Sequence, residues 1–353
     1  MNFNRVEEIA AAVLYEGYML YPYRASAIKN QQRWNFGVLC PRSWSELQEG
    51  SDAWKMQTEC LLQADASTLI GVEVRFLQIV NRTVGKPAEP LEKCDLWTKS
   101  QWNVVDKLTV GSRSLIPWQE AQERKVTVPS LKAAAFSFHW HSQFDFKPQR
   151  EIEPVYDTDG MIAGVVIREW EALAGSIDIH LRGCREGLVK VSVVIRNTTE
   201  VKPESLQTRA EALLHSLVSV HTILGADDGA FVSLLDPPRE FEDAAAKCSN
   251  LGTWPVLVGE DGAKDAMLSS PIILYDYPQI APESPGALFD GTEIDEILSL
   301  RILTMTDEEK EEMRLSDDRA RRVLERTENM PPEQFIKLHG AMRGVHPAVK
   351  EAR

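Results

Sequence analysis

The run from Ala135 to Phe146, AFSFHWHSQFDF, constrains the fold more than any other part of this chain. Apolar and polar residues alternate along it, and successive side chains of a β-strand point to opposite faces of a sheet. One face carries the aromatic residues Phe136, Phe138, Trp140, Phe144 and Phe146, and the other carries Ser137, His139, His141, Gln143 and Asp145. The run therefore predicts a strand with its aromatic face on a core.

Further strand patterns lie on both sides of this run. In 68–84 the apolar residues Val72, Val74 and Phe76 alternate with others, and the runs 164–170, 177–181 and 188–196 are short, apolar and rich in Val and Ile. Six or more strands with few helices among them favour antiparallel pairing. We therefore expect an α+β fold with an antiparallel β-sandwich-like or strongly twisted sheet core, packed helices and a helical C-terminal arm.

Helical patterns lie near the ends of the chain. Apolar residues recur at three and four in 4–19 and in 206–224, and Thr306 precedes Glu309 as in a capping box. The stretch 86–130 is rich in Pro, Trp and charge and suggests little regular structure, whereas PIILY predicts a strand. We expect three units: an N-terminal helix with a β-rich domain (1–202), an α+β subdomain packed on it (203–291) and a charged helical arm (292–353).

Charge and motif content exclude several classes of protein. The 39 basic and 53 acidic residues leave a net charge of −14, which argues against nucleic-acid binding. The amino terminus has no basic region before its apolar run, and no run reaches transmembrane length, so we expect a cytoplasmic protein without membrane insertion. The five cysteines form no C-x-x-C pair, and nucleotide-binding and G-x-S-x-G motifs are absent. These absences lean against an enzyme.

The stretch from Leu14 to Cys40 concentrates aromatic and basic residues in an acidic chain. Pro22 interrupts any helix there, so the residues after it are expected in a loop. Tyrosines anchor protein interfaces and guanidinium groups pair with carboxylates. A partner-binding surface is therefore predicted at Tyr21, Tyr23, Arg24, Lys29 and Arg33. The alternative is that most of the rings seal the first helix onto a sheet.

A resemblance also rests on this stretch. YEGYMLYPYRASAIKNQQRWNFGVLCPRSW, together with SPIILYDYPQIAPESPGALFDGTEIDEILSLRILTMTDEEK near the other end, resembles bacterial proteins encoded in operons for uptake nickel–iron hydrogenases. The resemblance implies an accessory or assembly role with hydrogenase subunits as partners. It carries no functional residues over to this chain.

A candidate metal site comes from the strand patterns alone. His139 and His141 form an H-x-H pair that projects from one strand face, and His180 lies with Asp178 on the polar face of 177–181. If these strands are neighbours, the three histidines and a carboxylate form a cluster that suits zinc, iron or nickel. The alternative is a solvent-facing polar side of the sheet with no cofactor, which alternation by itself explains.

Three functional hypotheses follow. The first is a non-catalytic accessory protein that acts through protein contacts, possibly for a nickel–iron hydrogenase. The second is a metal-dependent enzyme or metal-handling protein that uses His139, His141 and His180. The third is a structural protein that assembles with itself into a homo-oligomer.

Overall fold

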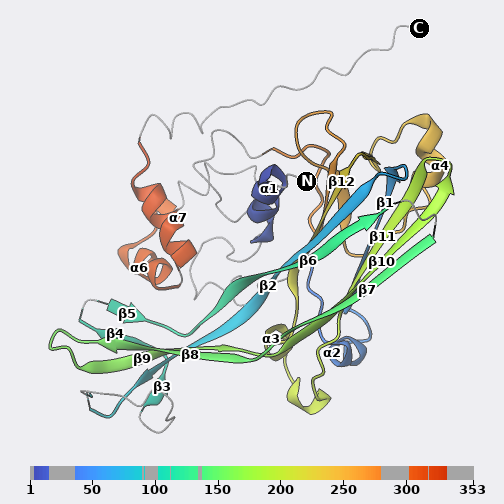
Figure 1. The fold of residues 1–353 in the computed structure, drawn as a ribbon. Helices are drawn as coiled ribbons and strands as arrows, with labels where there is room; N and C mark the ends of the chain where they lie inside the picture. The colour runs from blue at the N-terminus through green and yellow to red at the C-terminus, as the bar shows by residue number, and fades with distance from the viewer. Residues whose placement is uncertain are drawn as a thin grey trace.

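The computed structural model describes residues 4–15, 36–89, 91, 102–111, 113–133, 137–279, 302–316 and 318–331. Within these ranges β-strand is the commonest regular structure, and every strand pairing is antiparallel. Two large sheets pack together and a few helices flank them (Figure 1). The expected α+β, sandwich-like fold is confirmed.

The first sheet has five strands in the order β13-β1-β11-β10-β7. Their bounds are β13 (Ala230–Val232), β1 (Lys55–Gln63), β11 (Leu188–Asn197), β10 (Leu173–Arg185) and β7 (Ser137–Phe146). β10 and β11 form a hairpin, and Gly187 in its turn has a φ of 71° that an L side chain rarely adopts. β7 lies at one end of the order, so among the described strands β10 is its single partner.

The second sheet is built on β2 (Leu69–Lys86), a strand of 18 residues. β12 (Val218–Asp227) pairs with its first half and β9 (Ile162–Trp170) with its second half, while β6 (Trp118–Lys132) runs along its other edge. The sheet is completed by β14 (Trp254–Leu257), β15 (Ala266–Ser270), β8 (Gln149–Tyr156) and β3 (Asn103–Val105), and β4 (Leu108–Val110) and β5 (Arg113–Leu115) form a separate hairpin. β2 thus runs from the sandwich into a distal extension (Figure 1).

The core lies between the two sheets. The inner face of β10 contributes Ile177 and Ile179, and the inner face of β2 contributes Val74 and Phe76, all of them fully buried. Phe76 also contacts the aromatic face of β7, with ring centroids 5.7 Å from Phe144 and 6.0 Å from Phe146. The prediction that the aromatic side of 135–146 faces a core is confirmed for the described residues.

Helices cover the outer face of the second sheet. Apolar side chains of α1 (Asn4–Leu14), α2 (Arg42–Leu47), α3 (Arg209–Leu214), α6 (Asp307–Ser316) and α7 (Asp318–Glu328) pack there. Arg82 on β2 fastens α6, because its guanidinium donates to the Leu315 carbonyl at 3.0 Å while pairing with Glu120 at 2.8 Å. On the first sheet, η4 (Arg239–Phe241) and α4 (Glu242–Ala245) pack beside β1, at the side away from β7 (Figure 1).

Several local predictions were wrong. The helix expected over 206–224 ends at Leu214, and β12 begins at Val218, because a central strand buried on both faces shows the continuous apolar run of a buried helix. The stretch 86–130, expected to have little regular structure, contains most of β6. The strand expected at PIILY is absent from that position among the described residues, because β15 ends just before Pro271.

The Thr306 capping box is confirmed, with the Glu309 carboxylate 3.0 Å from the Thr306 amide.

The first two predicted units, 1–202 and 203–291, both supply strands to the two sheets. The range 203–291 supplies β12 to the middle of the second sheet. It also supplies β13 to the edge of the first sheet, next to β1. The C-terminal arm contributes α6 and α7, which pack on the second sheet. Across the described ranges, no helix has the length and apolar character needed to cross a membrane.

Candidate functional site

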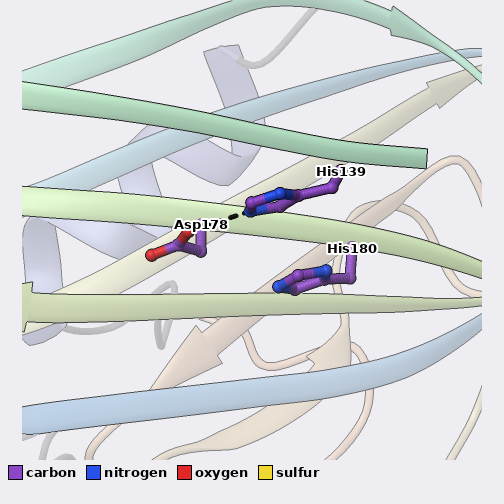
Figure 2. Close-up of side chains that lie close together, drawn as sticks. All are labelled: His139, Asp178 and His180. Carbon is purple, nitrogen blue, oxygen red and sulfur yellow. Dashed lines mark hydrogen bonds and ion pairs between the residues drawn. The ribbon is translucent and has the colours of Figure 1, made fainter.

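The outer face of β7 and β10 brings the predicted histidines together. The register of the two strands places His139 opposite His180 and His141 opposite Asp178. The strands are therefore neighbours, as the cluster hypothesis required. The inward-facing residues of β10 are held by the core, which fixes the outward direction of Asp178 and His180 (Figure 2).

Asp178 is the centre of the cluster. His139 Nε2 and His141 Nδ1 each lie 3.0 Å from Asp178 Oδ1, and because an ionised carboxylate can only accept, both ring nitrogens donate. Arg196 of β11 pairs with Oδ2. Burial opposes ionisation of Asp178, but the hydrogen bonds from His139 and His141 and the charge of Arg196 outweigh it and lower its pKa. Asp178 is therefore an ionised carboxylate whose orientation is fixed by these three partners.

His139 and His180 stack on each other. Their ring centroids are 4.2 Å apart and the ring planes differ by 2°. Burial lowers the pKa of His180, and the nearby His139, Arg182 and Arg196 lower it further. Asp178 opposes this shift only in part, and the lowered pKa favours the neutral ring, which has one nitrogen with a lone pair. The nearest ligand atoms of His139, Asp178 and His180 all lie within 4.8 Å of one another.

Sequence reasoning found the three histidines but gave Arg196 no role. The signal was present in the alternation of 188–196, which places Arg196 on the polar face with Lys190 and Ser192. Asp145, which follows on the histidine face of β7, pairs instead with Lys147 at 2.7 Å and stays outside the cluster. His141 contacts Asp178 but does not belong to the compact set of His139, Asp178 and His180.

The two remaining described histidines serve elsewhere. His221 is fully buried on β12, and its Nδ1 donates to the Ser219 carbonyl at 2.7 Å while Nε2 lies 3.1 Å from Ser270 Oγ. Burial lowers the pKa of His221 to about 4, so the ring is neutral. His215 is the residue directly after α3 and caps the C-terminal end of that helix.

The predicted partner-binding residues Tyr21, Tyr23, Arg24, Lys29 and Arg33 lie outside the described residues. Tyr15, at the start of the same aromatic stretch, is buried under the helix α1 and donates to Glu123 at 2.8 Å. For this ring the alternative interpretation, sealing the helix onto the sheet, is the one that the structure supports.

The edge of the first sheet offers a second candidate surface. β7 and β6 each have one strand partner among the described strands, β10 and β2 respectively. Arg124 of β6 lies 4.5 Å above the ring of Phe146, the last residue of β7, so the two strands approach each other at that end of β7. The inward side chains of β7 are half-buried: Phe138, Trp140, Ser142, Phe144 and Phe146.

A cavity of about 410 Å³ lies beside the N-terminal end of β1. Its charged lining includes Asp52 and Arg209, whose Oδ1 and Nε are 3.6 Å apart, and Asp52 also accepts from Trp44 Nε1 at 2.8 Å. This carboxylate therefore takes part in two local contacts within the described residues.

Comparisons with family models, with curated proteins and with solved structures find no match to this chain.

Proposed function

We propose that this chain is a non-catalytic accessory protein that acts through protein contacts, with β7 as a contact strand. One observation carries the proposal: β7 is a regular strand of ten residues that has a single strand partner among the described strands and a half-buried aromatic row on its inner side. A strand of this length spans roughly 33 Å at about 3.3 Å per residue. That is long enough to pair with an extended segment of another protein.

Edge strands favour such pairing because their outer N–H and C=O groups can form a ladder with a further strand. Proteins commonly block this with proline, a bulge or an inward-pointing charge. β7 contains no proline, and its pairing with β10 runs without a register shift. Its inward residues are aromatic apart from Ser142, so an added strand also gains apolar contacts.

The partner class comes from the resemblance. We propose that the segment added to β7 belongs to a subunit of an uptake nickel–iron hydrogenase. The aromatic and basic residues Tyr21, Tyr23, Arg24, Lys29 and Arg33 form a second contact surface in this proposal. A cytoplasmic location fits the net charge of −14 and is part of the same proposal.

The test compares two lysine substitutions on β7. Ser142→Lys points a charge into the inner side of the edge, whereas Gln143→Lys adds the same charge on the outer face one residue away. Binding of purified hydrogenase subunits is measured by biolayer interferometry. We expect Ser142→Lys to weaken binding about tenfold or more, since burying an unpaired charge costs more than 1.4 kcal/mol. Gln143→Lys is expected to stay within about threefold of wild type.

Hydrogen exchange supplies the second measurement. Pairing with a partner strand protects the backbone amides of β7 that point away from β10. Amide hydrogen exchange at 137–146 should therefore slow when the partner is added. Equal affinities for the two lysine variants, or unchanged exchange along β7, would refute the contact strand. Light scattering on the free protein distinguishes self-assembly, because a homo-oligomer formed through this edge would dissociate in Ser142→Lys.

A further inference from the structure

We propose that His139, Asp178 and His180 bind one divalent transition-metal ion on the outer face of the first sheet. The inference rests on the side-chain geometry of β7 and β10 and does not depend on the proposed protein contacts. Figure 2 shows the three side chains gathered on this face.

The backbone already places the ligands at a suitable spacing. His139 and His180 are directly opposite across the ladder, so their Cβ atoms are held about 5 Å apart. An ion with ligand bonds of about 2.1 Å in tetrahedral geometry holds its ligand atoms about 3.4 Å apart. The present ligand atoms lie within 4.8 Å of one another. Contraction to the bound spacing thus requires side-chain rotation and no movement of the strands.

The two imidazoles can make that rotation. The His139 side chain is 52% exposed, and His180 is also exposed, so neither ring is locked by packing. The two rings lie in parallel planes, so a tilt of each ring would bring one nitrogen of each toward a common point. His139 now donates from Nε2 to Asp178, so its proton must shift to Nδ1 before Nε2 can bind an ion. A neutral imidazole carries one proton in either tautomer, and no net proton is lost.

Two further residues hold the carboxylate in place. Arg196 binds Oδ2, which leaves Oδ1 as the oxygen directed toward the imidazoles. His141 Nδ1 donates to Oδ1 and fixes its orientation. Such outer partners keep a ligand aligned and commonly affect metal affinity 10- to 100-fold. They distinguish this cluster from histidines and acids that merely share a solvent-facing sheet side.

The ligand chemistry selects the ion. Two imidazole nitrogens and one carboxylate oxygen suit zinc, nickel, cobalt or ferrous iron, and suit calcium and magnesium poorly because those ions prefer oxygen ligands. The solvent-facing side of the cluster leaves a coordination position for water. Because the ligands come from β7 and β10, the ion would also join the edge strand to its neighbour.

The experiment titrates untagged protein with Zn²⁺ by isothermal calorimetry and with Co²⁺ by visible absorption. We expect one equivalent of Zn²⁺ and the intense bands of four-coordinate Co²⁺. His180→Ala removes a ligand and should weaken binding about 100-fold or more, whereas His141→Ala should weaken it about tenfold, as expected of an outer partner. Gln143→Ala, on the same strand and face, is the matched control and should bind as wild type does.

Failure is equally clear. The inference is overturned if wild-type protein binds no Zn²⁺ at about 100 µM, or if His180→Ala binds as tightly as Gln143→Ala. His180 is exposed, so its substitution should preserve the fold, which circular dichroism checks. Asp178→Asn gives a second ligand deletion with little change of shape. The titration uses the metal alone without a protein partner, so its failure leaves the β7 contact proposal standing and the reverse also holds.

Discussion

Asn197 joins three segments of the chain at the end of β11. Its side chain is fully buried, and Nδ2 donates to the Leu39 and His215 carbonyls, each at 2.8 Å, while Oδ1 accepts from the Thr199 amide at 2.8 Å. Both of its donors and one acceptor site of Oδ1 are used inside the protein. We therefore predict that Asn197→Asp, which keeps the shape and removes the donor, destabilises the fold strongly.

The magnitude follows from the partners. Two hydrogen bonds are lost at about 1 kcal/mol each. The Leu39 carbonyl still accepts from the Leu217 amide at 3.1 Å, so the main unsatisfied group is the His215 carbonyl, at about 1–3 kcal/mol. The sum is about 3–5 kcal/mol when no donor remains, whereas the protonated acid keeps one O–H donor and loses about 1 kcal/mol less. An ionised Asp facing two carbonyl oxygens is disfavoured further, so its folded pKa lies above the unfolded one and stability falls as pH rises above about 4.

The assay is urea unfolding followed by tryptophan fluorescence at pH 5 and pH 7. Thr198→Ala is the matched control, because Thr198 is exposed and adjacent, and it should change the free energy of unfolding by less than about 0.5 kcal/mol. A loss below about 1 kcal/mol in Asn197→Asp, or a loss that is the same at both pH values, would refute the reasoning.

Two further predictions concern buried positions in the two sheets. His221, with its pKa lowered to about 4, should make the wild type lose about 3 kcal/mol of stability as pH falls from 6.5 to 4, because the unfolded chain takes up the proton first; His221→Gln should flatten this part of the pH profile in urea unfolding, and an unchanged slope would contradict it. Gly175→Ala would place a Cβ 2.2 Å from the Phe144 ring, so we expect a loss of about 1–3 kcal/mol and faster amide exchange along β7. Unchanged exchange there would show that β7 accommodates the methyl group without loosening.

The strands with one face on the core and one face outward could be predicted from the sequence. Along β7 every second residue is exposed, so the alternation of 137–146 gave the strand, its faces and the shared direction of His139 and His141. The proximity of His180 required one added assumption, that β7 and β10 are neighbours, and their register confirms it. The polar alternation on each strand was therefore enough to assemble most of the cluster.

The strands buried on both faces could not be predicted in the same way. β12 is buried at nine consecutive positions because helices cover one face and the core covers the other, so the period of two disappears. The same burial hides the meaning of His221, which looks like a free imidazole in the sequence. Asn197 is a similar case: Asn197-Thr198-Thr199 matches a glycosylation sequon, but the side chain of Asn197 is closed off by its three hydrogen bonds.

The two proposals use different groups of one strand. Partner binding uses the backbone edge of β7 that faces away from β10, and metal binding uses the outward imidazole of His139 with ligands on β10. An ion at the cluster therefore ties the edge strand to its neighbour without occupying the free edge. Ser142→Lys acts on the inner side of the edge, and His180→Ala acts on the outer face of the adjacent strand. Each substitution consequently removes one property and leaves the atoms that carry the other in place, which allows the two roles of β7 to be separated experimentally.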